Sequence, residues 1–213
     1  MNYGYDLDVS AAKNAESIGK YIRETGKYIG KFTRAEVLIS KEKGSRGIEF
    51  DFLCDGKECT LQVWTHSANG EPFSGNNMIH AIMTCLKLRG IKPNIQRTQK
   101  YDYDLKQKVI IDANVFADLM NKPIGLLLQK ELSEYQGKEK SKMLIYAAFD
   151  ANTEQTASEI IDKIAQPVAL GKMVANLADK DNRKHQPNAS ASQQYANYRG
   201  GNQNQPLDDD LPF

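Results

Sequence analysis

Residues 47–66, GIEFDFLCDGKECTLQVWTH, decide the fold, because they contain two alternating segments on either side of a turn signal. Apolar and polar side chains alternate through residues 47–54 and again through residues 58–66, which is the period of a half-buried strand. Asp55-Gly56 lies between them, and a two-residue hairpin turn needs positive φ at both central positions, which this pair tolerates. The stretch therefore predicts an antiparallel hairpin.

Further segments on both sides extend this hairpin into a larger sheet. Residues 28–39 are rich in β-branched and aromatic side chains, which predicts a strand before the hairpin. Residues 78–88 place apolar side chains at helical spacing, after a cap at Asn76 or Asn77. Two more strands are predicted over residues 123–135 and 142–150. We therefore predict a mainly β fold: an OB-fold-like five-stranded antiparallel barrel with a helix between strands 3 and 4, although an open sheet would have the same order of elements.

The stretches between and after these elements predict loops and short helices. Residues 91–109 are polar, with two tyrosines set among charges, and indicate a loop. Asp112 is a suitable cap for a short helix over residues 113–120. Residues 157–174 have a helical pattern that Pro167 breaks or kinks.

The end of the sequence changes composition twice. Residues 180–206 are rich in Asn, Gln, Ser and Gly and carry no aliphatic side chain larger than alanine, which predicts a disordered linker. Residues 207–213, LDDDLPF, are acidic and apolar, which suits a partner pocket with a basic rim around a hydrophobic hole. An acidic tail that only kept the protein in solution would not need a terminal phenylalanine. The expected partner-binding residues are Asp208, Asp209, Asp210, Leu211, Pro212 and Phe213.

This tip resembles the C-terminal tip of the bacterial single-stranded DNA-binding proteins, and the polar stretch before it resembles their disordered linker. The body is similar to a group of phage-encoded single-stranded DNA-binding or recombination-associated proteins. Three stretches carry that second resemblance: GKYIGKFTRAEVL at residues 26–38, NNMIHAIMTCLKL at residues 76–88 and KPIGLLLQKEL at residues 122–132. The body departs from the bacterial housekeeping pattern, which leaves the oligomeric state open, a homo-oligomer included.

The resemblance implies that the protein binds and protects single-stranded DNA without strong sequence preference during replication, recombination or repair. It also implies recruitment of proteins of these processes through the tip. The expected organisation is an N-terminal extension (1–26), an OB-fold-like DNA-binding domain (27–152), a helical segment (153–179), the linker (180–206) and the tip (207–213). Two alternatives stay open: a phage recombination annealase or helper, and an adaptor or decoy that competes for host proteins that recognise such tips.

Proteins of this kind combine a positive groove with aromatic faces on which bases stack. Side-chain alternation predicts that every second side chain of the first and third strands points outward. Lys31 interrupts this pattern in the first strand, as a bulge would. A bulge or twist that shifted this alternation would instead place the aromatic residues in the core. The expected DNA contacts are Trp64, Gln62 and His66 on the third strand, Tyr28, Phe32 and Arg34 on the first, and Lys57, Lys130 and Tyr135 at hairpin ends.

Charge and motifs favour binding over catalysis. The net charge is only +1, so a nucleic-acid interface must be a local patch. Three cysteines (Cys54, Cys59 and Cys85) without a secretory leader or a long apolar span predict free thiols in a cytoplasmic protein. The resemblance implies that the cell is bacterial or phage-infected. The sequence holds no phosphate-binding glycine loop, no second half for a zinc site and no nuclease-like acidic cluster, so we expect neither enzymatic activity, cofactor nor metal.

Overall fold

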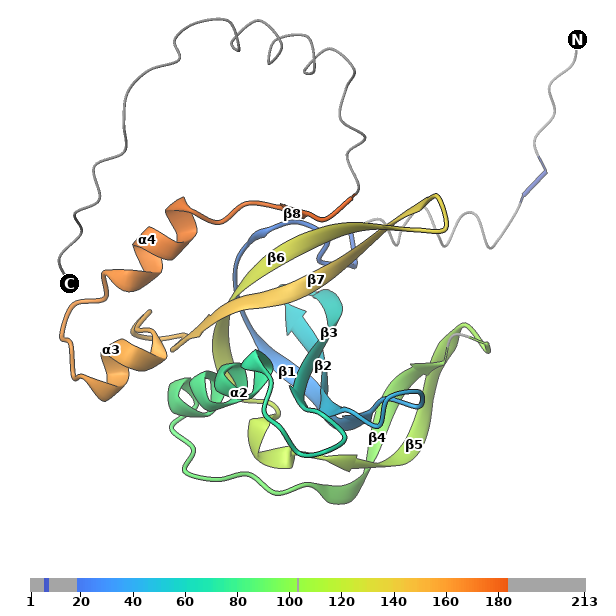
Figure 1. The fold of residues 1–213 in the computed structure, drawn as a ribbon, viewed down its shortest axis with the longest axis horizontal. Coiled ribbons are helices and arrows are strands. Elements are labelled where there is room, and N and C mark those ends of the chain that lie inside the picture. The colour runs from blue at the N-terminus through green and yellow to red at the C-terminus, as the bar shows by residue number, and fades with distance from the viewer. Residues whose placement is uncertain (1–5, 8–18, 103, 184–213) are drawn as a thin grey trace, which may run out of the picture. The chain divides into compact units, whose positions relative to one another are not determined.

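The computed structural model describes residues 6–7, 19–102 and 104–183, which form a mainly β structure built on an antiparallel sheet (Figure 1). The predicted linker beyond residue 183 and the tip lie outside the described residues. The strands are β1 (Gly26–Ile39), β2 (Arg46–Cys54), β3 (Lys57–His66), β4 (Asn94–Asp102), β5 (Gln107–Val115), β6 (Pro123–Tyr135), β7 (Lys138–Phe149) and β8 (Lys180–Asp181). The helices are α2 (Ser74–Cys85), a 3-10 turn (Ala117–Leu119), α3 (Ala157–Ile161) and α4 (Ala169–Ala175).

Strand β1 connects the parts of the sheet because it pairs with three other strands. Its first half, from Gly26 to Lys31, pairs with β6, and from Lys31 onward it pairs with β2. Glu36, further along, also pairs with Val115 of β5. The register shifts between Phe32 and Arg34, so one extra residue forms a bulge there. This bulge decides which side chains of β1 enter the core.

The predicted hairpin is confirmed: β2 and β3 pair from Arg46↔His66 to Cys54↔Lys57, and Asp55 and Gly56 both have positive φ. The predicted loop over residues 91–109 is wrong, because β4 and β5 form a second hairpin there. The short helix predicted over residues 113–120 is reduced to the 3-10 turn, since Val115 is buried as the last residue of β5.

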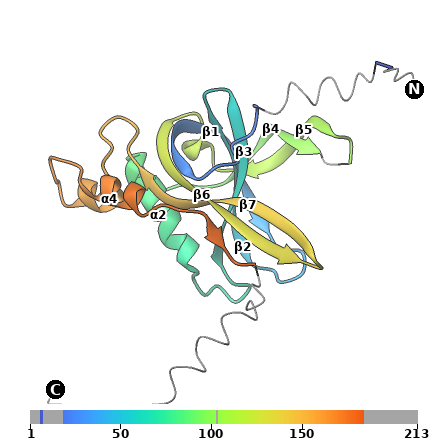
Figure 2. The ribbon, with the colours of Figure 1, turned by 90° about the horizontal axis from the view of Figure 1, so that it is seen from above.

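The predicted five-stranded closed barrel is not what the described residues form. Their sheet has eight strands, in the order β3-β2-β1-β5-β4, with β6 joining β1 to β7 and β8. No ladder within residues 19–183 joins β3 to β7, so the sheet stays open between them. Seen from two directions, the β4–β5 and β6–β7 hairpins extend away from α2 and their tips stay apart (Figures 1 and 2).

The main core lies between the inner faces of β1, β2, β3 and β6 and the apolar side of α2. Phe32, Phe50 and Phe52 are fully buried in it, together with Ile82 of the helix. The helix approaches β3 closely at Gly75: a Cβ there would lie 2.2 Å from the backbone oxygen of Trp64. Glycine is therefore the residue that lets α2 lie directly on the sheet.

The helical pattern predicted over residues 157–174 forms two short helices, and the predicted break at Pro167 lies between them. Helix α3 begins with a capping box of Thr156 and Glu159, and the same Glu159 carboxylate accepts hydrogen bonds from the backbone N–H groups of Val168 and Ala169. Hydrogen bonds from Ala169, Thr156 and Val168 lower the pKa of Glu159 to about 2. One buried carboxylate thus joins the two helices, and Leu170 of α4 packs on Leu127 and Phe149 in a second small core. Among the described residues, no helix is long and apolar enough to cross a membrane.

Candidate nucleic-acid interface

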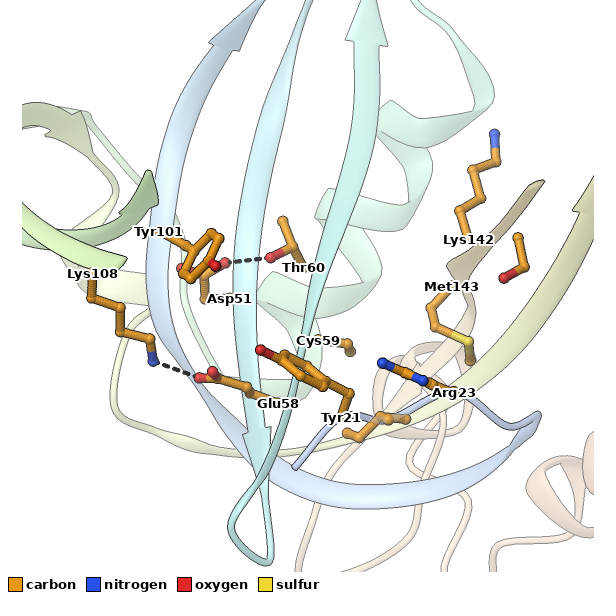
Figure 3. A pocket seen from close by; sticks show the side chains of 12 residues that line it. Tyr21, Arg23, Asp51, Glu58, Cys59, Thr60, Tyr101, Lys108, Lys142 and Met143 are labelled. Carbon is orange, nitrogen blue, oxygen red and sulfur yellow. Dashed lines mark hydrogen bonds and ion pairs between the residues drawn. The ribbon is translucent and has the colours of Figure 1, made fainter. Parts of the chain in front are cut away.

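A groove of about 660 Å³ crosses the β3 strand, with the β4–β5 hairpin on one side and β7 on the other (Figure 3). Five parts of the chain line it: the segment before β1, the middle of β2, the start of β3, the β4–β5 hairpin and the middle of β7. Its lining residues are Tyr21, Ile22, Arg23, Asp51, Glu58, Cys59, Thr60, Tyr101, Lys108, Ser141, Lys142 and Met143.

The segment before β1 is fixed in the groove by backbone bonds to one residue of β3. The N–H of Ile22 donates to the carbonyl oxygen of Glu58 (3.0 Å), and the N–H of Glu58 donates to the carbonyl oxygen of Lys20 (2.8 Å). Ile22 is buried in the core, whereas Tyr21 is 42% exposed. The Arg23 guanidinium carbon lies 5.4 Å from the Tyr21 ring centroid. The guanidinium therefore lies over one face of the ring, and a base would have to stack on the other face or displace it.

The opposite side of the groove presents a second tyrosine with a lysine next to it. Tyr101 and Lys108 are directly paired across the β4–β5 ladder, and Tyr101 is 37% exposed. The Lys108 Nζ lies 2.6 Å from an Oε of Glu58. Tyr21 and Tyr101 thus offer two aromatic faces on either side of Glu58 (Figure 3).

The lysines of the groove are paired with carboxylates of the same chain. Besides the Lys108–Glu58 pair, Lys142 lies 2.8 Å from Glu131. Hydrogen bonds from Lys142 and Lys180 lower the pKa of Glu131. A phosphate entering the groove would compete with these carboxylates for the ammonium groups.

A charged cluster on the outer face of β1 and β2 contains Arg34, which the sequence placed among the DNA contacts. That expectation of an exposed Arg34 is wrong, because the residue is 2% exposed. Its guanidinium binds Asp51 (2.7 Å) and Glu49 (2.8 Å), and it also bonds Glu36. Burial alone would raise the pKa of Glu49, but hydrogen bonds from Gln62 and Arg34 lower it. With three carboxylates around it, Arg34 is a structural residue.

The expected exposure of Phe32 is also wrong, and the bulge in β1 is the reason. Phe32 precedes the extra residue and points into the core, where its ring centroid lies 4.4 Å from that of Phe50. Tyr28 lies on the same side and packs against the core, and its hydroxyl donates to the carbonyl oxygen of Glu24. The prediction applied one continuous alternation of side chains to the whole strand. A bulge interrupts such an alternation, so the residues before it were assigned to the wrong face.

The other expected contacts reach the surface, but none of them lines the groove. Trp64 is half-buried and shares the outer face of β3 with exposed Gln62, whereas a register shift next to Trp64 interrupts the alternation before half-buried His66. Thr60, which lines the groove, lies on this face too. Four residues of strand separate it from Trp64, a distance of about 13 Å along the strand at the usual rise per residue. Lys57 is exposed and Lys130 is half-buried, while Tyr135 is exposed with the Lys140 Nζ 4.5 Å from its ring centroid.

The sequence predictions missed the residues that build the groove: Tyr21, Arg23, Tyr101, Lys108 and Lys142. The signal available for Tyr101 was an aromatic residue set among charges. Since residues 91–109 were predicted to be a loop, no face was assigned to Tyr101 or Lys108.

Cys54, Cys59 and Cys85 are free thiols within the part of the chain that the structure describes. Cys59 lines the groove, and burial raises its pKa to about 12, which keeps it protonated at neutral pH. No group of three or more His, Cys, Asp or Glu side chains in residues 6–7, 19–102 and 104–183 is placed to hold a metal ion. The sequence matches no protein-family model and no curated protein.

Proposed function

We propose that the protein binds single-stranded DNA in the groove between the β4–β5 hairpin and β7. One observation carries this proposal: two exposed tyrosines and three basic side chains from separate parts of the chain converge there (Figure 3). Stacking of a base on an aromatic side chain is typically worth about 1–3 kcal/mol and tolerates any base. A groove of this composition suits protection of single strands during replication, recombination or repair, without strong sequence preference.

The order of elements supports an OB-fold assignment for the body. Strands β1, β2 and β3 are followed by α2 and then by β6 and β7, which is the OB order if the β4–β5 hairpin is treated as an insertion. Strand β1 pairs with β2 on one side and with β6 on the other, as the first strand of such a barrel does. In this assignment the DNA would cross β3, and the inserted hairpin would form one wall of its path.

Replacing Tyr21 or Tyr101 with alanine should weaken oligonucleotide binding by about 1–3 kcal/mol each, because each change removes one stacking face. The measurement is fluorescence anisotropy of a labelled oligo-dT titrated with the full chain. Tyr146→Ala is the matched control, since Tyr146 is similarly exposed (41%) but does not line the groove. Glu58→Gln should strengthen oligonucleotide binding, because it removes the carboxylate that pairs with Lys108 and frees this lysine for a phosphate. If the wild-type chain does not bind, or both groove variants bind as Tyr146→Ala does, the proposed function is wrong.

We further propose that the acidic tip recruits other DNA-processing proteins. The residues that support this are Asp208, Asp209, Asp210, Leu211, Pro212 and Phe213, which combine charge for a basic rim with an apolar anchor.

Removing residues 207–213, or changing Phe213 to alanine, should abolish co-purification of replication and repair proteins from a bacterial lysate, measured by mass spectrometry. A synthetic LDDDLPF peptide should displace the same proteins from the full chain. Oligonucleotide affinity should be kept or slightly improved, since negative charge has been removed. Loss of DNA binding with every partner retained would reverse the roles assigned to groove and tip.

A further inference from the structure

Strand β4 is the last strand at one end of the sheet path, and its outer edge faces no other strand within residues 19–183. It is nine residues long, contains no proline, and pairs with β5 without a register shift. Such a regular, unpaired edge is a template for pairing with another chain. Proteins commonly protect edges of this kind with charged side chains, so the position of the charges decides what this edge accepts.

The sequence of β4, NIQRTQKYD, is complementary to itself when it is read in the antiparallel direction about Thr98. This register places Ile95 opposite Tyr101, Gln96 opposite Lys100, Arg97 opposite Gln99 and Asn94 opposite Asp102. All nine residues are paired, and no two like charges lie directly opposite each other, although the two Arg97 side chains are diagonal neighbours across the axis. An axis through Arg97 or Lys100 would instead set two identical cations directly opposite, which is destabilising.

The outer face of the hairpin also exposes apolar side chains, one of which lies on β4 itself. Ile95 is 73% exposed and Ile110 is 63% exposed, and both lie on the face of the hairpin that carries Tyr101. In the Thr98-centred register, Ile95 of one copy meets Tyr101 of the other at both ends of the pairing. An aliphatic-aromatic cross-strand pair is among the stabilising ones.

We propose that two copies of this chain form a dimer by antiparallel pairing of their β4 strands about Thr98. The occupant of the edge is a second copy because this register covers exposed Ile95 with Tyr101 at both ends and places no two like charges directly opposite each other. The dimer does not depend on the proposed DNA binding. If both hold, Ile95 of the second copy borders the groove at Tyr101, and the two Tyr101 side chains lie about 20 Å apart along the paired strands.

The test uses sedimentation velocity of the full chain over a range of concentrations without DNA, with variants at exposed Gln99. Gln99→Glu sets two carboxylates opposite the two Arg97 guanidinium groups, and Gln99→Lys sets two ammonium groups there. With two cross-strand pairs changed, the dimer dissociation constant should fall about 2- to 30-fold for the first variant and rise by a similar factor for the second.

The double variant Arg97→Glu/Gln99→Lys restores opposite charges and should recover dimerisation relative to Gln99→Lys. Circular dichroism checks that all variants keep the fold. A chain that is monomeric at every concentration overturns the proposal. So does a dimer whose dissociation constant is the same in Gln99→Glu and Gln99→Lys. Because DNA is absent, these outcomes are independent of the failure or success of the groove.

Discussion

Replacing Arg34 with alanine should lower the free energy of unfolding by about 3–5 kcal/mol, the loss typical when one partner of a buried ion pair is removed. The guanidinium contacts carboxylates on β1 and β2, so its loss leaves Glu36, Glu49 and Asp51 facing one another with Lys100 as the remaining cation of the cluster. Urea denaturation measures the change.

Two further variants separate this explanation from a general loss of packing. Arg46→Ala removes an exposed arginine from the neighbouring strand and should change stability by less than about 0.5 kcal/mol. Adding Glu49→Gln to Arg34→Ala should restore part of the stability, because one of the uncompensated negative charges is removed. A loss in Arg34→Ala no larger than that in Arg46→Ala would show that the charged cluster does not hold the two strands together.

Replacing Gly75 with alanine should destabilise the protein by about 1–3 kcal/mol, since the helix must move away from the strand to admit a methyl group. The added Cβ would lie 2.2 Å from the Trp64 backbone oxygen and 2.9 Å from a methyl carbon of Val63. Thermal or urea unfolding gives the loss, and Trp64 fluorescence reports the shift of the helix.

Gly171→Ala is the matched control, because Gly171 lies within α4 and a Cβ there would have no heavy atom within 4 Å outside its chain neighbours and the backbone of its own helix. This change should stabilise the protein by about 0.5–1 kcal/mol, as alanine is the better helix former. If both substitutions change the free energy of unfolding in the same direction, the close approach of α2 to β3 does not restrict position 75 to glycine.

Local patterns predicted much of the sheet but little of the groove. The β2–β3 hairpin is evident because alternation and Asp55-Gly56 agree, and β6 has the predicted bounds. Strand β4 was missed because its only buried side chain is Thr98, so a polar strand on the edge has the composition of a loop. Lys31 interrupts the alternation close to the bulge before Arg34, but it does not show at which residue the alternation shifts. The extra residue reverses the alternation between the residues before it and those after it. The prediction therefore placed Phe32 on the outer face instead of in the core.

The pairing of Lys108 with Glu58, and of Lys142 with Glu131, means that the groove carries its own counterions. When a lysine neutralises a phosphate of a nucleic acid, cations condensed on the strand are released, which drives association and makes it depend on ionic strength. Here the group displaced is a tethered carboxylate, which stays beside the ligand and gains no translational entropy. Because the carboxylate still offsets part of the lysine charge, fewer counterions are released from the strand than the number of lysines implies. If the groove binds single-stranded DNA as proposed, aromatic stacking has to supply the larger share of affinity, and that affinity should depend less on salt concentration than the number of lysines implies.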